Sequence, residues 1–172
     1  MKKKRVLVTG GLGFLGSFLV NKLIEKKFSV TVFDDKSRGK LSRVNLLGLD
    51  KYIIGDIRKK SNFKKLKNNF DIIFHLAFIN GTDFFYEKPR LVLDVGVRGI
   101  LNIIDFAKTN KKCQFILASS SEVYNFPKKI PTDESTEILI PNILNPRFSY
   151  AGGKIISELI TINYLKEYKI PF

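Results

Sequence analysis

Tyr150 and Lys154 are the two side chains of this sequence whose types and spacing best suit proton transfer. They stand four residues apart in a segment whose pattern predicts a helix from about Ser149 to Tyr168, so both lie on one helix face. An ammonium beside a phenol favours the phenolate, so a tyrosine of ordinary pKa about 10 could act as a base at neutral pH. The same spacing also occurs by chance on solvated helix faces.

Three serines, Ser119 to Ser121, follow a predicted strand over residues 114–118. A hydroxyl at the carboxyl end of a parallel strand faces the crevice in which such sheets bind ligands. Ser120 could therefore hydrogen-bond a substrate hydroxyl and Tyr150 together. Taken alone, a serine run of this kind indicates only a turn.

A glycine-rich turn near the N-terminus is typical of phosphate binding. The apolar run from Val6 to Val8 leads into glycines at Gly10, Gly13 and Gly16, and a helical pattern begins directly behind them. The first glycine permits the turn, the second lets phosphates approach the backbone, and the third lets the helix press onto the sheet. The free N–H groups of the helix can then hold a pyrophosphate.

An acidic residue at the end of the next predicted strand completes this pattern. A carboxylate there can accept both ribose hydroxyls of an adenosine and would repel a 2′-phosphate, which favours NAD over NADP. Asp34 is the candidate, although Lys36 and Arg38 nearby could accommodate a phosphate. The alternative is that Asp34 only caps a turn.

Strand and helix patterns alternate along the whole chain, which predicts an α/β fold with a doubly wound parallel sheet of the Rossmann type. We expect strands at 5–9, 29–33, 51–55, 71–76 and 114–118, and helices behind the glycines, from Pro89 to Lys108 and from Ser149 to Tyr168. Residues 125–146 form an irregular connection, a length that is usually functional. Residues 170–172 are expected to lead into a sixth strand, so the sheet is predicted to be incomplete at its C-terminal end.

Composition limits the class of protein. With 172 residues, 44% hydrophobic and 27% charged, the chain suits one soluble domain. The net charge of +14 could attract nucleic acid, but the lysines are scattered and no RNA-binding signature is present, so no nucleic-acid partner is expected. A single cysteine, Cys113, fits a reducing compartment. The basic N-terminus imitates a signal peptide but continues into the glycine turn, so we expect a cytoplasmic domain.

Five stretches form a set in chain order: residues 9–16, 55–57, 75–77, 119–124 and 150–154. Together they resemble the extended short-chain dehydrogenase/reductase superfamily, and within it the NAD-dependent nucleotide-sugar epimerase/dehydratase branch. The resemblance implies an NAD site formed by Gly10, Gly13, Phe14, Leu15, Gly16, Asp34, Asp35, Lys36, Ser37, Asp56, Ile57, Leu76, Ala77, Phe78, Ser119, Tyr150 and Lys154.

The same resemblance implies catalytic roles for Ser120, Tyr150 and Lys154, which match the family's Ser/Thr, Tyr and Lys. Tyr150 would remove a hydroxyl proton as a hydride passes to the nicotinamide, giving a keto-sugar. Epimerases then return the hydride, dehydratases eliminate water and decarboxylases lose CO₂. Glu122 matches an acid that assists the later step in dehydratases and decarboxylases, or it is a solvent-facing loop residue. His75 matches a strand-end position without a catalytic role, and no metal is expected.

Two residues depart from the family pattern. Gly96 stands where an asparagine near the cofactor is common, so another group must replace its amide. Asn125 stands where glycine usually follows Val-Tyr.

We therefore expect residues 1–172 to be the NAD-binding domain of an NAD-dependent nucleotide-sugar epimerase or dehydratase, with the substrate domain outside this chain. Family members run to roughly twice this length, in keeping with two such parts. The alternatives are a nucleotide-sugar decarboxylase or reductase of the same superfamily, and a non-catalytic NAD-binding regulatory or interaction protein. The expected partners are a nucleotide-diphosphate sugar and a second copy of the chain, through the helices starting near Pro89 and Ser149, without a membrane.

Overall fold

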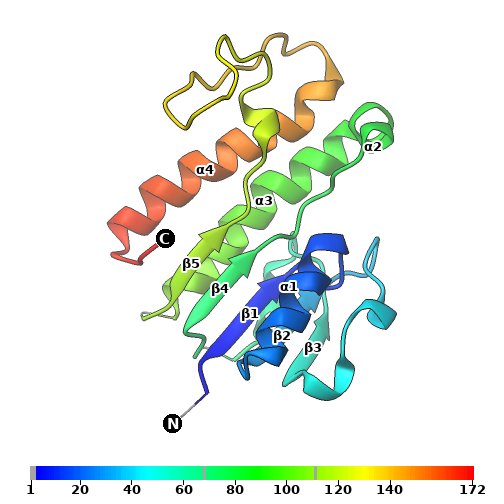
Figure 1. Ribbon diagram of the computed structural model, residues 1–172, viewed down its shortest axis with the longest axis vertical. Helices are drawn as coiled ribbons and strands as arrows, with labels where there is room; N and C mark the ends of the chain where they lie inside the picture. The colour runs from blue at the N-terminus through cyan, green and yellow to red at the C-terminus, as the bar shows by residue number, and fades with distance from the viewer. Residues whose placement is uncertain (1–2, 68, 111) are drawn as a thin grey trace.

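Five parallel strands form one sheet, which the computed structural model describes within residues 3–67, 69–110 and 112–172. The strand order is β3-β2-β1-β4-β5 (Figure 1). The strands are β1 (Arg5–Thr9), β2 (Ser29–Asp34), β3 (Lys51–Ile54), β4 (Ile72–His75) and β5 (Gln114–Leu117). The order reverses between β1 and β4, where doubly wound sheets bind ligands. The predicted fold class is confirmed.

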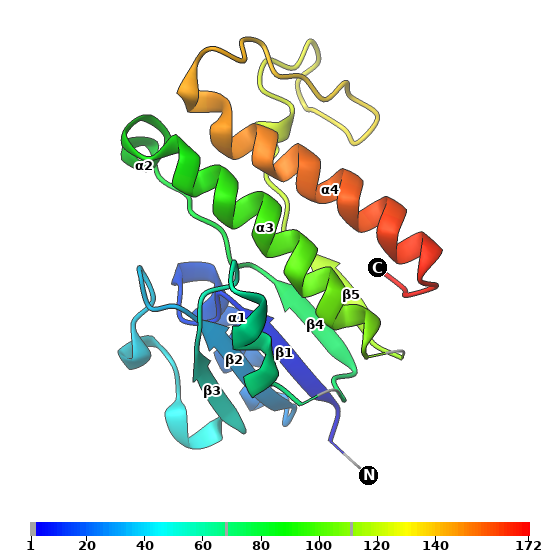
Figure 2. The same ribbon diagram turned by 180° about the vertical axis from the view of Figure 1, so that it is seen from behind.

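Helices cover both faces of this sheet, as Figures 1 and 2 show from opposite sides. They are α1 (Phe14–Glu25) on one face and α3 (Pro89–Lys108) with α4 (Ser149–Glu167) on the other, while the short α2 (Thr82–Glu87) packs against α3. On one face Val20 and Leu23 of α1 pack on the β-branched residues of β1 and β2. On the other face, Ile103 and Ile104 of α3 pack with Phe115 of β5 in the second core. α3 and α4 run side by side.

Short 3₁₀ turns connect these elements, at Leu41–Arg43, Leu46–Gly48, Lys60–Lys65, Ser121–Val123 and Pro146–Phe148. The segment 125–145 contains no regular element, as its prolines predict. Asn125 takes a φ of 48°, in the left-handed region that glycine adopts freely and asparagine tolerates, which explains how it replaces the family's glycine.

The last residues of the chain lie beside the outer edge of β5. After α4, the Pro171 carbonyl accepts a hydrogen bond of 2.8 Å from the Phe115 N–H. This is the side of β5 on which a sixth strand would pair. Among the described residues, none of the helices combines the length and the apolar character needed to cross a membrane.

Candidate active site

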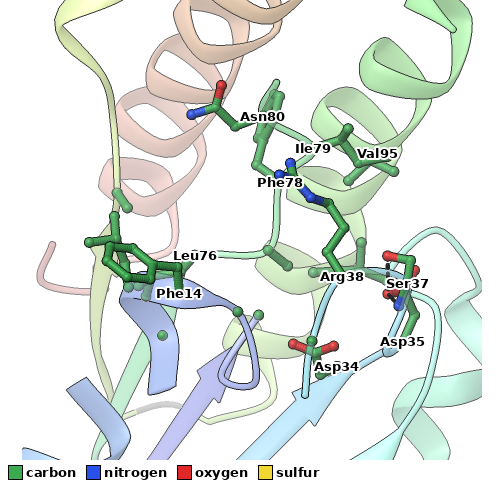
Figure 3. Close-up of a pocket in the computed structure, with 18 of the residues that line it drawn as sticks. Phe14, Asp34, Asp35, Ser37, Arg38, Leu76, Phe78, Ile79, Asn80 and Val95 are labelled. Atoms are coloured by element: carbon green, nitrogen blue, oxygen red, sulfur yellow. Dashed lines mark hydrogen bonds between the residues drawn. The ribbon is translucent and has the colours of Figure 1, made fainter. Parts of the chain in front are cut away.

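A cavity of about 560 Å³ opens above the carboxyl ends of the strands, beside the reversal between β1 and β4. The glycine turn, the loops after β2 and β4, and the first turns of α4 surround it (Figure 3). The residues expected at a cofactor line it with the exception of Lys36: they are Gly10, Gly13, Phe14, Leu15, Gly16, Asp34, Asp35, Ser37, Asp56, Ile57, Leu76, Ala77, Phe78, Ser119, Tyr150 and Lys154.

The glycine turn works by close backbone approach. Gly10 has a φ of 71°, and a Cβ there would lie 2.7 Å from the Ala77 nitrogen, so β1 can turn only because this position lacks a side chain. A Cβ at Gly16 would overlap the Gly10 carbonyl oxygen, which keeps α1 tight against the turn. Phe14, Leu15 and Gly16 of the first turn of α1 line the cavity, and this turn contains no acidic side chain, so the helix N-terminus is suited to bind an anion.

Asp34 ties the end of β2 to the glycine turn. Its carboxylate accepts a hydrogen bond from the Leu12 N–H at 3.0 Å and another from the Lys36 N–H at 2.8 Å. Burial raises the pKa of Asp34, and these backbone hydrogen bonds oppose that rise. Asp34 therefore does cap a turn, while each oxygen keeps a further lone pair for a ribose hydroxyl.

Lys36 belongs to this turn through its backbone. Its φ is 62° and its N–H is the one bound by Asp34, but it is not among the residues lining the cavity. Arg38 lies there instead. Its side chain extends toward Ile79 and Asn80 (Figure 3), and its guanidinium stands 5.5 Å from the centre of the Phe84 ring.

Asp56 lines the cavity after β3, and Arg58 fixes its carboxylate. The Arg58 Nη2 donates to the Asp56 Oδ2 at 2.8 Å, and its Nε donates to the Oδ1 at 3.0 Å. Burial would raise the pKa of Asp56, but the hydrogen bonds from Arg58 outweigh it and lower that pKa. Asp56 thus stays ionised and fixed at the position expected to border an adenine.

Tyr150 and Lys154 enter the cavity from the first turns of α4. The Tyr150 ring stacks on Phe85 of α2, with centroids 5.1 Å apart and an interplanar angle of 22°. The Phe78 ring is edge-to-face with it, with centroids 5.2 Å apart and an interplanar angle of 85°. The Lys154 Nζ lies 5.8 Å from the centre of the Tyr150 ring and donates a 2.6 Å hydrogen bond to the Ala118 carbonyl.

Burial is the main influence on the ionisation of this pair in the ligand-free chain. It raises the pKa of Tyr150, while the Ser120 hydroxyl lowers that pKa and the charge of Glu122 raises it. Burial lowers the pKa of Lys154 to about 8, opposed by Glu158. In the ligand-free chain, burial is the largest influence on the Tyr150 pKa, and the Lys154 ammonium is directed at the Ala118 carbonyl. That Lys154 and a bound nicotinamide cation together favour the phenolate stays a prediction.

Ser120 and Glu122 both influence the pKa of Tyr150, but they are not among the residues lining the cavity. The Ser120 Oγ accepts the Glu122 N–H at 3.2 Å. Glu122 is not a free loop acid, because the Arg147 Nη1 donates to its Oε2 at 2.9 Å. The Arg147 guanidinium also lies 5.5 Å from the centre of the Phe85 ring.

His75 lies beneath the site and has no exposed edge. Its Nδ1 is 2.8 Å from the Thr9 hydroxyl, and its side chain is 1% exposed. Burial, followed by the charge of Lys154, lowers the pKa of His75 to about 3, so the ring is neutral at ordinary pH. Among the described residues, no group of three or more His, Cys, Asp or Glu side chains is placed to hold a metal.

Sequence reasoning did not identify Gly39, Phe85 or Arg147. A Cβ at Gly39 would lie 2.6 Å from both the Asp34 Oδ1 and the Leu12 Cβ, so this glycine lets the loop after β2 close over the carboxylate. A glycine shortly after the acidic strand end is a signal that could have been used. Phe85 and Arg147 meet Tyr150 and Glu122 only through the tertiary fold, and their local sequence gives no such signal.

The chain is similar to known proteins over nearly its whole length. The family model described as GDP-mannose 4,6 dehydratase matches residues 7–172. UDP-N-acetyl-alpha-D-glucosaminuronate decarboxylase of Bacillus cytotoxicus is 35% identical over 163 residues, which cover 94% of this chain and 50% of the relative. The chain thus spans about half the length of the curated relatives it matches.

Solved structures of sugar-nucleotide epimerases are also similar to this chain. The UDP-N-acetylglucosamine 4-epimerase of Methanobrevibacter ruminantium M1, in complex with UDP-N-acetylmuramic acid, is 31% identical with a TM-score of 0.85, over 99% of this chain and 53% of the other. The UDP-glucose 4-epimerase of Bifidobacterium longum, in complex with NAD⁺ and UDP, is 26% identical with a TM-score of 0.83, over 95% of this chain and 50% of the other.

Proposed function

Because this chain belongs to the GDP-mannose 4,6 dehydratase family, within the extended short-chain dehydrogenases/reductases, we propose that it supplies the NAD-binding and catalytic residues of an NAD-dependent nucleotide-sugar epimerase or dehydratase. The observation that carries this proposal is that the glycine turn before α1 and the Tyr150–Lys154 pair line one cavity. Dehydrogenation of a bound alcohol by NAD requires a phosphate site for the cofactor and a proton-transfer pair in the same cavity.

The residues of the cavity fit a dinucleotide. The Gly10–Gly16 turn leaves backbone amides open to a pyrophosphate, Asp34 offers carboxylate oxygens to a ribose, and Asp56 with Ile57 forms a wall for an adenine. Lys154 would hold the nicotinamide ribose. When bound, oxidised NAD supplies hydride acceptance and a positive ring charge that lowers the pKa of a nearby phenol.

The proposed reaction begins with Tyr150 as general base toward a sugar hydroxyl. The Ser120 hydroxyl lowers the pKa of Tyr150, so the serine favours the phenolate that accepts the proton. Stacking on Phe85 and edge contact with Phe78 hold the phenol in one orientation. The proton on Tyr150 is then available for return, which permits a reversible oxidation.

Glu122 bears on the step that comes after the oxidation. Glu122 follows Ser120 by two residues, and its ion pair with Arg147 holds its carboxylate in place. An acid–base group at this position can serve elimination or decarboxylation. A decarboxylase is therefore the main alternative, and it is favoured by the likeness to the Bacillus cytotoxicus relative. A superfamily reductase and a non-catalytic NAD-binding protein remain the other candidates.

The substrate class of the proposal is a nucleotide-diphosphate sugar, which matched relatives and structures carry in their names. We propose that a substrate domain completes the sugar site, because this chain spans about half of its relatives. A homodimer through α3 and α4 and a cytoplasmic location belong to the same proposal. The exposed side chains Leu93, Ile156, Leu159 and Ile162 on these helices support a partner there.

Product analysis tests the proposal. Purified protein with its substrate domain is incubated with NAD⁺ and a panel of uridine-, thymidine- and guanosine-diphosphate sugars, and products are identified by mass spectrometry and NMR. Unchanged mass with inverted stereochemistry indicates an epimerase, loss of water a dehydratase, and loss of CO₂ a decarboxylase. A protein that binds NAD⁺ but converts none of the sugars and forms no NADH would support the non-catalytic alternative.

A further inference from the structure

The ring of Phe78 fills a slot between α3 and α4 that exists because two helix positions lack a side chain. A Cβ at Gly96 would lie 2.5 Å from the Phe78 Cζ, and a Cβ at Gly153 would lie 2.9 Å from the same atom. Both clashes involve the tip of the ring, so the ring is inserted tip-first between the helices. The Phe78 ring thus takes the space that a side chain at Gly96 would need.

The inserted ring contacts both members of the candidate proton-transfer pair. The Lys154 Nζ lies 4.3 Å from the centre of the Phe78 ring, within the distance at which a cation is attracted to an aromatic face. The Tyr150 ring meets Phe78 at 5.2 Å in an edge-to-face arrangement. Phe78 also lines the cavity, and Figure 3 shows it beside Ile79 and Val95.

We propose that Phe78, lodged against Gly96 and Gly153, is a positioning residue that holds the Lys154 ammonium over its face and Tyr150 in edge-to-face contact with its ring. The ring thereby fixes the spacing of the pair in the ligand-free chain. This inference rests on the proposed roles of Tyr150 and Lys154, but its physical content can be measured without any cofactor.

Groups on several elements act on the charge of Lys154. Glu158 of α4 raises its pKa, while burial lowers it to about 8. The neutral His75 of β4 and the raised-pKa phenol of Tyr150 lie close by, and the Ala118 carbonyl after β5 accepts its hydrogen bond. A substitution at position 78 removes none of these groups, so a change in the titration of Lys154 reports on the ring.

The first test is Phe78→Leu, which keeps an apolar cover but removes the aromatic face. Losing a cation–π contact disfavours the charged amine, so the Lys154 midpoint should fall by about half a pH unit or more. The ¹³Cε shift of lysine-labelled protein measures it, with the resonance assigned by its loss in Lys154→Met. Phe84→Leu is the control, because that ring faces Arg38 and Lys88 instead and should leave the midpoint unchanged.

The second test is Gly96→Ala, which places a Cβ against the ring tip. In an open helix this change would stabilise the protein, so a lowered thermal midpoint together with a moved Lys154 titration indicates a filled slot. Leucine has no Cζ, so adding Phe78→Leu to Gly96→Ala should recover most of the lost thermal stability. A stabilising Gly96→Ala would overturn the proposal.

The outcomes separate this inference from the proposed function. NAD⁺ binding with a Lys154 midpoint that is unchanged or raised in Phe78→Leu would overturn the positioning role and leave the proposed function standing. A midpoint lowered as expected in a chain that binds no NAD⁺ would support the positioning role and contradict the proposed cofactor site.

Discussion

Tyr150 packs against the rings of Phe78 and Phe85, while the Lys154 ammonium donates a hydrogen bond to the Ala118 carbonyl. Burial raises the pKa of Tyr150 in the ligand-free chain, which favours its protonated form. We propose that the positive charge of a bound cofactor lowers this pKa and thereby allows proton transfer.

Tyr150→Phe should therefore abolish turnover of a nucleotide sugar while leaving NAD⁺ affinity nearly unchanged, because the ring and its packing are kept and only the transferable proton is lost. Turnover and calorimetric affinity are to be measured on the same preparations of the protein with its substrate domain. Turnover retained within about tenfold of the wild type would contradict the assigned role.

Lys154 should make the stability of the chain depend on pH. Its pKa in the folded chain is about 8, below the ordinary 10.5, so between these values the unfolded chain binds a proton that the folded chain has released. The free energy of unfolding should rise with pH through this window, relative to Lys154→Met, by about 3 kcal/mol in total. Below the folded pKa both states carry the proton, and the difference stays constant.

Urea unfolding of the two proteins at several pH values checks this expectation. If the difference in free energy of unfolding between the wild type and Lys154→Met does not change between pH about 8 and about 10, the lysine has an ordinary pKa in the folded chain and the expectation is wrong.

At the scale of elements, the end of β2 links the sheet to the glycine turn. Asp34 is 7% exposed and accepts the N–H of Leu12 and that of Lys36, whereas Asp35 is exposed and bonds only within its own turn to Ser37. The two neighbouring carboxylates thus contribute differently to the stability of the turn, and a pair of matched substitutions can separate their contributions.

Asp34→Ala should lower the free energy of unfolding by about 1–3 kcal/mol, because it leaves the buried Leu12 N–H without its acceptor. It should also weaken NAD⁺ binding. Asp35→Ala is the control and should change stability by no more than about 0.5 kcal/mol. Denaturant unfolding and calorimetry give both quantities, and equal losses from the two substitutions would refute the distinction.

The elements themselves could be predicted because each carries its own signal. Alternating apolar runs located the strands, Pro89 located the start of α3, and the glycines located the turn before α1. The side-chain partners of Tyr150 could not be predicted in this way. Phe78 and Phe85 contact it from other segments of the chain. Glu122 pairs with Arg147, and the local sequence around either residue does not predict the other as its partner.

The ionisation of Tyr150 and Lys154 could not be predicted from the sequence for a related reason. Helix spacing places Tyr150 and Lys154 on one face, but the pKa of each depends on how far the surrounding protein removes it from water. Burial of that kind is a property of the folded chain, so residue spacing identifies the pair but not the direction of the pKa shift on the phenol.

At the scale of the whole molecule, α3 and α4 present apolar side chains on their outer faces. Leu159 is 57% exposed, and Ile156 and Ile162 flank it one turn away on either side. If this face joins two copies, Leu159→Glu should convert a dimer into a monomer, since a charge would be buried at the interface. Sedimentation at several concentrations measures this, with Lys166→Glu as an exposed control, and a monomeric wild type would contradict the expectation.

The proposal as a whole depends on a dinucleotide lying from the N-terminus of α1 to the Tyr150–Lys154 pair. Calorimetric titration of the folded chain with NAD⁺ tests this most directly, in the wild type and in Gly13→Val, whose side chain would occupy the space above the turn. We predict saturable binding of NAD⁺ by the wild type, weaker binding of NADP⁺, and loss of binding in a Gly13→Val chain that unfolds at the wild-type temperature. A folded wild type that gives no heat with either dinucleotide, or a Gly13→Val variant that binds NAD⁺ unchanged, would contradict the account.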